Sequence, residues 1–419
     1  MQNTTLTGDE KNSTQVIICP DCDLLVSVPL KMKPGKMLCP CCDHLLLSTH
    51  TDTLNRLISY IISALIFFLL SLSFPFMSYD AGGIERTISL VHSVTTLLSQ
   101  NYWFLAGLIA AVILLLPFLF LCGLLYVLLP LKFARQLAYS SVVLKFSLVI
   151  LPWSMVEVFL VSVFVSIIKL STSASIGLGL SFYAFAFFSV FLTAVILLLD
   201  AHQIWNWLTP CHQSAGKRGT AISQQLTTCH ICHCSVPVSQ SHCQRCNTTV
   251  SARKPFSIQR TLAFLSVAIL LYIPANLLPI MQTRIMGKDE FNTILGGILV
   301  LWQHGSYPVA FIIFIASILV PIAKMIALGW LSFSVIFQRS NRLREKAMVY
   351  RITEFIGRWS MLDVFVVALL VSLIHQGRVL AVYPGPAIIA FAGVIIFTIL
   401  AAMSFDTRLL WDQRKNDAR

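Results

Sequence analysis

Charged side chains are scarce in this sequence of 419 residues. Only 11% of the residues are Asp, Glu, Lys or Arg, whereas 57% are hydrophobic and the mean hydropathy is +0.79. Soluble domains carry roughly 25% charged residues, so this composition excludes a globular protein covered by water. It predicts an integral membrane protein.

Motifs of common catalytic sites are missing as well. There is no G-x-x-x-x-G-K-[ST] phosphate-binding loop, no H-E-x-x-H pair and no nucleophile elbow. No signal peptide precedes the first cysteines, so the first apolar run, from Leu57, is expected to act as its own insertion signal. The chain is therefore predicted not to be an enzyme.

Long apolar runs are present instead, and eight are long enough to cross a membrane as helices. They cover about 57–77, 103–129, 144–168 and 177–199, and then about 260–282, 307–337, 352–375 and 385–405.

Lys and Arg gather between the second and third spans of each set and in the polar insert between the sets. Such clusters mark cytoplasmic segments, so both termini and both cysteine-rich segments are predicted to be cytoplasmic. The net charge of +12 is assigned to this topology and not to nucleic-acid binding. Two predicted outer loops hold amphipathic stretches, at 87–98 and 293–302, for which a short surface helix and an ordered loop remain alternatives.

The two sets of spans are copies of each other. Trp153 to Trp205 aligns with Trp359 to Trp411 without gaps, and Pro75 and Pro117 recur as Pro279 and Pro321. Four spans per copy is an even number, so both copies enter the membrane in the same direction. Such parallel repeats often enclose a transport pathway, although duplication without a pathway is the alternative.

The predicted fold is an all-α polytopic membrane protein with two tandem parallel repeats of four transmembrane helices, each preceded by a small cytoplasmic zinc ribbon. The predicted domains are a disordered N-terminus (1–14), ribbon 1 (15–50), repeat 1 (51–208), ribbon 2 (209–256), repeat 2 (257–412) and a tail (413–419).

Eight of the twelve cysteines form four C-x-x-C pairs, two before each repeat. Two such pairs complete a tetrahedral sulfur site of the kind that Zn²⁺ prefers, with no open position. The sequence predicts two structural zinc ions, and a redox thiol pair is the rival interpretation. The predicted ligands are Cys19, Cys22, Cys39 and Cys42, and then Cys229, Cys232, Cys243 and Cys246. Six neighbours are interpreted as bystanders: Cys41, His44, His230, His233, Cys234 and His242.

One acid recurs inside an apolar span, in the phrase Trp-Ser-Met-x-Glu/Asp-Val-Phe. It is Glu157 in the first copy and Asp363 in the second. Ionisable groups in hydrocarbon are costly and mark function or pairing. In the second copy we expect Asp363 to pair with Lys324, whereas Phe120 stands at the equivalent place in the first. A structural ion pair, a proton relay and a lipid headgroup contact are the alternatives. The predicted polar core consists of Lys324, Asp363, Ser317, Ser360, Thr398 and Glu157.

These features in combination resemble the paraquat-inducible protein A (PqiA) family. The residues that carry the resemblance are the cysteine modules, the phrase Pro-Ala-Asn-Leu-Leu-Pro at 274–279, the segment from Ser317 to Lys324 and the phrase that runs from Gly357 to Phe365. The similarity is greatest to the intermembrane lipid transport branch, the LetA (YebS) type. The first copy departs from the pattern, with Leu151-Pro152 in place of Gly-Arg, so the resemblance does not assign a role to Glu157.

The resemblance implies a multi-pass protein of the bacterial inner membrane that serves the cell envelope. Its partner would be a homo-oligomeric MCE-domain protein that forms a hydrophobic tunnel across the periplasm, and phospholipids would be loaded or unloaded at the tunnel base. The eight cysteines would be the metal ligands. Two other functions remain: a membrane anchor for the MCE protein without transport, and a redox or stress-response protein acting through its cysteines.

Overall fold

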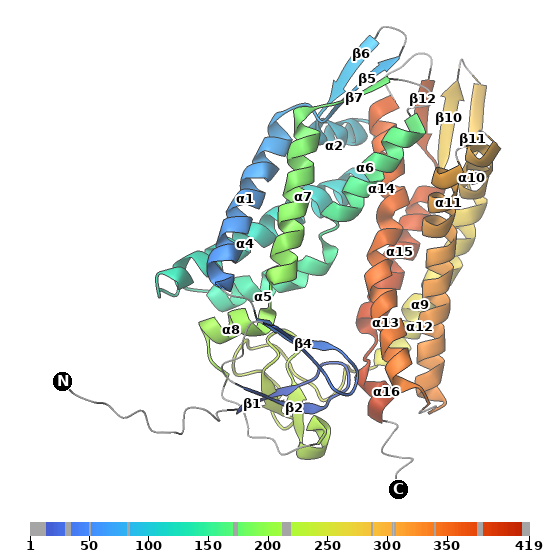
Figure 1. Ribbon diagram of the computed structural model, residues 1–419. Helices are drawn as coiled ribbons and strands as arrows, with labels where there is room; N and C mark the ends of the chain where they lie inside the picture. The colour runs from blue at the N-terminus through green and yellow to red at the C-terminus, as the bar shows by residue number, and fades with distance from the viewer. Residues whose placement is uncertain are drawn as a thin grey trace.

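The structure is a computed structural model that describes residues 14–29, 35–49, 52–81, 84–170, 175–211, 219–285, 288–303, 305, 307–338, 341–374 and 380–412. Two helical blocks stand side by side, with small strands at both ends (Figure 1). The first block contains α1 (Thr53–Ser73), α3 (Trp103–Ile109), α4 (Leu116–Lys132), α5 (Ser140–Ile150), α6 (Val156–Leu170) and α7 (Leu180–Leu198). The second contains α9 (Ser257–Leu277), α11 (Tyr307–Phe314), α12 (Val320–Ile336), α13 (Leu343–Gly357), α14 (Leu362–Ile374) and α15 (Ala387–Ser404).

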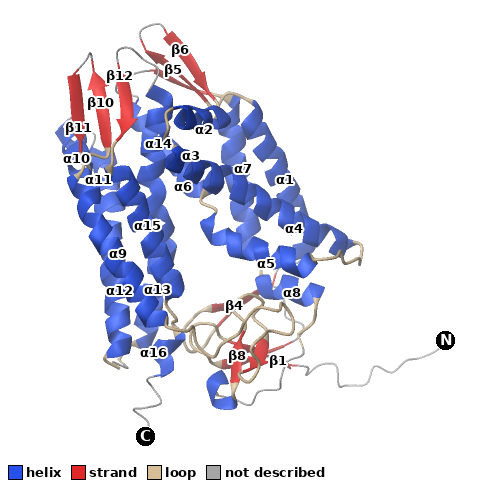
Figure 2. Cartoon of the chain, turned by 180° about the vertical axis from the view of Figure 1, so that it is seen from behind, coloured by secondary structure: helices blue, strands red, loops and turns tan. Residues whose placement is uncertain are grey.

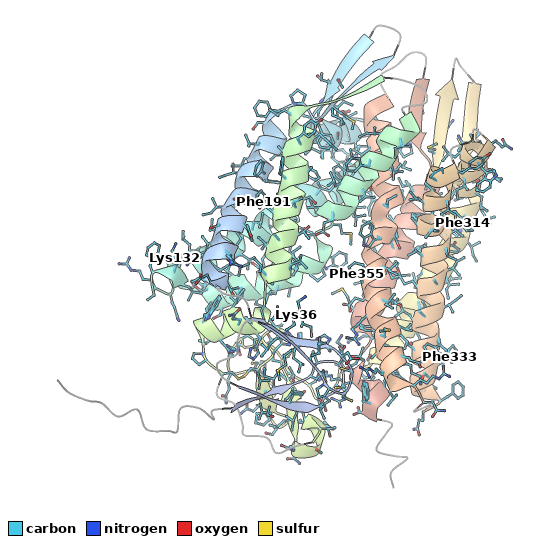
Figure 3. The ribbon with its side chains drawn as sticks, in the orientation of Figure 1. Lys36, Lys132, Phe191, Phe314, Phe333 and Phe355 are labelled. Atoms are coloured by element: carbon cyan, nitrogen blue, oxygen red, sulfur yellow. A yellow bond between two sulfur atoms is a disulfide. The ribbon has the colours of Figure 1, made fainter. Side chains whose placement is uncertain are left out.

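Seven helices in the described part of the chain are long and apolar enough to cross a membrane. The remaining predicted span, about 352–375, falls on α13, a 3₁₀ turn at Arg358–Met361 and the 13 residues of α14. Large apolar side chains cover the outside of the blocks, as Phe314 and Phe333 do at 39% and 55% exposure (Figure 3). The prediction of a mostly helical membrane protein built from two repeats is confirmed.

The two blocks have the same internal packing and meet along their equivalent helices. α1 packs along α7 in the first block, and α9 packs along α15 in the second. Between the blocks α6 packs on α14, where the rings of Phe159 and Phe365 meet edge to face with centroids 5.8 Å apart. These two residues are equivalent in the repeat. Equivalent residues touch each other only where a two-fold axis passes between them, so the axis runs through this contact.

Proline marks a second shared feature of the blocks. Pro117 and Pro321 each follow a π-helical segment, at Ala110–Leu115 and Ile315–Leu319. A proline ring has no N–H and clashes with the carbonyl one turn back, and the wider π turn relieves that clash. Each block therefore has a long helix that is locally widened just before a proline.

Two three-stranded sheets at the end opposite the ribbons were not predicted (Figure 2). Their strand orders are β6-β5-β7 and β11-β10-β12, equivalent in the repeat. The strands are β5 (Met77–Ala81), β6 (Ile84–Ile88), β7 (Ser175–Leu178), β10 (Met281–Ile285), β11 (Lys288–Asn292) and β12 (Leu380–Pro384). The amphipathic stretches beside them are helices, α2 (Leu90–Ser99) and α10 (Ile294–Gln303), and not loops.

Short hairpins form the two ribbons at the other end. Ribbon 1 holds β1 (Thr14–Ile18), β2 (Leu25–Pro29), β3 (Gly35–Leu38) and β4 (Leu45–Thr49), and ribbon 2 holds β8 (Leu226–Thr228) and β9 (Ser235–Pro237). Helices α8 (Ala201–Leu208) and α16 (Arg408–Asp412) lie beside them.

Equivalent aspartates join each ribbon to its own repeat. Asp200 accepts a hydrogen bond from the backbone N–H of Ser48 at 3.1 Å, and Asp406 accepts one from the backbone N–H of Lys254 at 2.9 Å. The second oxygen of each carboxylate caps the helix that follows, accepting the N–H of His202 and of Arg408 respectively. A carboxylate at a helix N-terminus also suits the helix dipole. These two aspartates therefore fix where each ribbon meets the membrane helices.

Gly179 and Gly385 close the join between sheet and helix in each block. A Cβ at either position would lie about 2 Å from a backbone oxygen, that of Pro75 or of Pro279. We expect Gly385→Ala to lower the free energy of unfolding by about 1–3 kcal/mol, because the backbone must move to admit the methyl group. Thermal unfolding in detergent would measure the loss.

Gly297→Ala in α10 is the matched control, because nothing lies within 4 Å of its added Cβ. An equal loss of stability in both variants would contradict the packing explanation.

Candidate functional site

The four cysteines of each ribbon converge on one point. In ribbon 1 the sulfurs of Cys19 and Cys42 are 3.5 Å apart, as are those of Cys22 and Cys39. In ribbon 2 the corresponding distances are 3.4 Å and 3.5 Å. Within each group all four sulfurs lie within 4.8 Å of one another. A tetrahedral zinc site with Zn–S bonds of about 2.3 Å has edges of about 3.8 Å, so both groups fit a metal ion.

Thiol chemistry in the clusters also fits metal binding. Hydrogen bonds among the cluster thiols lower the pKa of Cys39 and of Cys246 and raise the pKa of Cys22 and of Cys232, so two of the four thiols in each group are favoured as thiolates even without a metal ion. Thiolates are the ligands that metal ions require. Among the described residues, only the eight predicted cysteines form these two groups.

The six predicted bystanders lie outside both clusters. The Nδ1 atom of His44 lies 2.9 Å from the carboxylate of Asp21. Burial by itself would lower the pKa of His44, but the hydrogen bond and charge of Asp21 outweigh burial and raise it. Cys234 forms a disulfide with Cys211, which the sequence did not predict.

Arginines connect each cluster to the helices of the other repeat. Arg351 of α13, in the second repeat, donates to the carbonyl of Cys42 at 2.6 Å and to that of Asp43 at 3.1 Å. Arg245 of ribbon 2 donates to Asn206 of α8, in the first repeat, at 2.8 Å and lies 5.8 Å from the centre of the Trp205 ring. The loops that present the cysteines are thus part of the contact between ribbons and membrane blocks.

The repeated acid was predicted to lie inside an apolar span, and in each copy the structure places it just after a 3₁₀ turn that divides this span into two helices. In the first copy a 3₁₀ turn, Leu151–Trp153, interrupts the span, and Glu157 falls in the first turn of α6. In the second copy the 3₁₀ turn is Arg358–Met361, and position 363 is the second residue of α14. Pro152 explains the first break, because proline removes a helical hydrogen bond. An acid in the first turn is also favoured by the helix dipole.

Lys324 lies at the break in the second block and is 4% exposed. Its ammonium donates to Thr398 Oγ1 at 2.9 Å and to the carbonyl of Gly357 at 3.4 Å. Gly357 is the last residue of α13, and its carbonyl has no partner within the helix. The cation therefore lies where the dipole of α13 is negative and where a helix ends inside the block.

Gly357 is what makes room for the lysine. A Cβ at this position would lie 2.7 Å from Lys324 Nζ and 2.9 Å from Cε. In the first repeat the equivalent pair is Leu151 and Phe120, and Phe120 is fully buried. The first copy therefore differs from the second at two positions that touch each other. Phe120 and Leu151 stand where the second copy has Lys324 and the glycine that makes room for it.

Two predicted serines lie near this lysine on neighbouring segments. Ser317 is fully buried in the π-helical segment and donates to the carbonyl of Ile313 at 2.7 Å. Ser360 is 2% exposed in the 3₁₀ turn, and its hydroxyl has no hydrogen-bond partner among the described residues. The π-helical segment and α15 both contact this turn. The side chain of Asp363 lies outside the described part, so its ion pair with Lys324 stays a prediction.

Glu157 has a different partner from the one that Asp363 was predicted to have. Its carboxylate accepts a hydrogen bond from Thr193 of α7 at 2.9 Å. The first block therefore holds an acid–hydroxyl pair, and the second holds a buried cation bound to a hydroxyl and a carbonyl.

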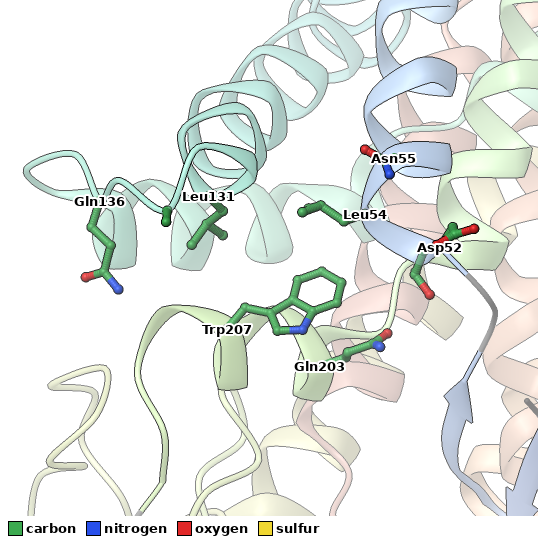
Figure 4. Close-up of a pocket in the computed structure, with 9 residues that line it drawn as sticks. Asp52, Leu54, Asn55, Leu131, Gln136, Gln203 and Trp207 are labelled. Atoms are coloured by element: carbon green, nitrogen blue, oxygen red, sulfur yellow. The ribbon is translucent and has the colours of Figure 1, made fainter. Parts of the chain in front are cut away.

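The pocket in Figure 4 lies elsewhere, at the ribbon end of the first block. Asp52, Gln136, Gln203 and Trp207 are among its lining residues, and none of them belongs to the polar core. The lysine site is thus packed inside helices and is not part of this pocket.

Known proteins share both the repeat and the length of this chain. The family model described as "Paraquat-inducible protein A" matches residues 54–209 and again 258–415. The chain is 36% identical to "Intermembrane transport protein PqiA" of Escherichia coli (strain K12), over 97% of this chain and 98% of that one. It is 30% identical to "Lipophilic envelope-spanning tunnel protein A" of the same strain, over 95% and 91%.

A "Probable intermembrane transport protein" of Haemophilus influenzae is 29% identical over 95% of this chain and 96% of that one. No solved structure matches. Identity is higher to the first of these relatives than to the LetA-type branch that the motifs favoured. The double match and the full-length similarity show that the chain belongs to the paraquat-inducible protein A family.

Proposed function

We propose that this protein is the inner-membrane subunit of an intermembrane lipid transport system. It loads or unloads phospholipids at the base of a periplasm-spanning tunnel, which an MCE-domain partner forms as a homo-oligomer. Relatives named intermembrane transport protein and envelope-spanning tunnel protein support transport between membranes. Both termini and both ribbons lie in the cytoplasm, and the two sheets face the periplasm and the partner.

The single observation that carries the proposal is the buried Lys324. Burying an ammonium group inside a membrane protein costs free energy, and no carboxylate partner is described for this one. Such a residue therefore indicates a role in transport or in the architecture of the helices. Its glycine neighbour and its place at a helix break indicate a site built for a cation. We infer that Lys324, Asp363, Thr398, Ser317 and Ser360 are the polar core of transport, and that Glu157 belongs to the architecture of the first block.

In this proposal each ribbon binds one Zn²⁺ ion, which stabilises its fold. Each ion would be bound by one group of four cysteines, which leaves no coordination position for a substrate. Their role is structural, because hairpins with strands of three to five residues have too small a core to fold alone.

Bound zinc tests the metal assignment. We expect two zinc ions per chain in the purified protein and one in Cys229→Ser, because loss of one thiolate opens its site. Elemental analysis by plasma mass spectrometry measures the content. Cys122→Ser, in α4 and outside both groups, should keep two ions. A wild-type protein free of zinc, or a Cys229→Ser variant with two ions, would contradict the assignment.

Gly357→Ala tests the polar core without removing a charge. The added methyl group must displace the ammonium of Lys324, so envelope function should fall to that of Lys324→Ala. The readout is rescue of detergent resistance in cells that lack the gene, with the amount of membrane-inserted protein measured in parallel.

Gly329→Ala is the matched control on the lysine's own helix, since its Cβ would meet only Leu265 at 3.7 Å. If Gly357→Ala and Lys324→Ala merely fail to accumulate, the lysine is structural. If they accumulate and rescue fully, the polar core has no part in transport.

An affinity pull-down from membranes distinguishes the proposed transport function from the two alternatives, anchoring of the MCE protein without transport and a redox or stress-response function. We expect an MCE-domain protein to copurify with the wild-type chain and equally with Lys324→Ala. A variant that retains the partner but loses function distinguishes transport from simple anchoring. Repeated absence of an MCE-domain protein would refute both of these functions.

A further inference from the structure

The protein contains a disulfide between ribbon 2 and the segment after α8, and the proposed function gives this bond no role. It joins Cys211 to Cys234, whose Cα atoms are 6.0 Å apart. Cys211 lies three residues beyond α8, at the end of the first repeat, and Cys234 lies two residues beyond the cluster cysteine Cys232. The bond therefore fastens ribbon 2 to α8. Neither sulfur belongs to one of the two groups of four cysteines.

Noncovalent contacts cross the same interface. Arg245 of ribbon 2 donates to Asn206 of α8 at 2.8 Å and to the carbonyl of Cys232 at 3.4 Å. The carbonyl of Cys234 accepts the N–H of Cys229 at 3.0 Å, as part of the loop that presents the cluster. The hydrogen bond to Asn206 and the contact of Arg245 with the Trp205 ring therefore join ribbon 2 to α8 beside the disulfide, whereas the other two bonds shape the cysteine loop within ribbon 2.

A cavity of about 520 Å³ opens beside the bond. Its lining includes both cysteines together with Thr209, Gln240, Gln244 and Arg245. Cys211 is half-buried and Cys234 is buried, so Cys211 is the sulfur more open to attack. A guanidinium beside two amide side chains suits a small peptide that carries a carboxylate.

We propose that Cys211 and Cys234 form a reversible redox site that exchanges with a low-molecular-weight peptide thiol, of which glutathione is the probe. In reduction, one thiolate attacks the sulfur of Cys211, forms a mixed disulfide there and releases Cys234, which takes up a proton. A second thiolate attacks the peptide sulfur of the mixed disulfide and releases Cys211 as a thiol and the oxidised peptide. Two electrons pass from two peptide thiols to the protein, and oxidation is the reverse.

Oxidation then stiffens the join between ribbon 2 and the first repeat. Closing the loop between residues 211 and 234 removes conformations in which ribbon and helix separate. The site is independent of the proposed lipid transport, since it uses no residue of the polar core.

The test uses the full-length, zinc-loaded protein in detergent, equilibrated with reduced and oxidised glutathione at a series of ratios. After acid quenching and alkylation, mass spectrometry measures the fraction of peptides linked through 211 and 234. We expect full conversion between linked and free forms across the series, with zinc content unchanged. Amide hydrogen exchange at 235–237 should slow about tenfold or more in the linked form.

Three variants sharpen the result. Cys211→Ser should abolish the link, whereas Cys41→Ser, at a half-buried cysteine of ribbon 1 outside the disulfide, should leave it unchanged. Arg245→Ala should slow the reaction with oxidised glutathione about tenfold, as expected for loss of a charged hydrogen bond, but not the reaction with uncharged hydroxyethyl disulfide.

Three outcomes would overturn the proposal: both thiols stay free at every ratio, the link resists excess reduced glutathione, or the link forms only when zinc is lost. Each can occur whether or not the protein transports lipid, so the two proposals fail separately.

Discussion

The contact between α6 and α14 is the constraint on which the rest of the structure depends. Phe159 and Phe365, equivalent residues of two repeats, meet ring to ring, and Ser162 donates to the carbonyl of Leu362 at 3.1 Å beside them. Helix α2 of the first block also packs on α14, and α11 of the second packs on α6, so the contacts between the blocks gather around this crossing. The paired sheets and the long helices with their π turns occupy equivalent positions on either side of this contact.

Symmetry makes the differences between the repeats informative. The same helix break occurs in both blocks, yet one is filled by Phe120 and Leu151 and the other by Lys324 and Gly357. A break that served packing alone would not need a cation, since an apolar pair fills the first copy. The second break therefore holds a polar group in the place where the fold tolerates an apolar one.

Much of this architecture could be predicted from the sequence, because its signals are local. Apolar length predicts the spans, and cysteine spacing predicts the clusters. Other features depend on partners distant in the chain. Strands β5 and β7 pair across almost a hundred residues with four to five residues each, which leaves no pattern in either. The helix break had a signal in Pro152, but Gly357 gives none without knowledge that Lys324 lies against it.

The arginines at the ribbons have a consequence for motion. Ribbon 1 is bonded to Asp200 of the first block and, through the carbonyls of Cys42 and Asp43, to Arg351 of the second. Ribbon 1 therefore links the two blocks at one end, while the contact between α6 and α14 links them along the axis. If one block rotates against the other, we expect the pivot to lie near ribbon 1. The largest displacement would then occur at the opposite end, between the two sheets.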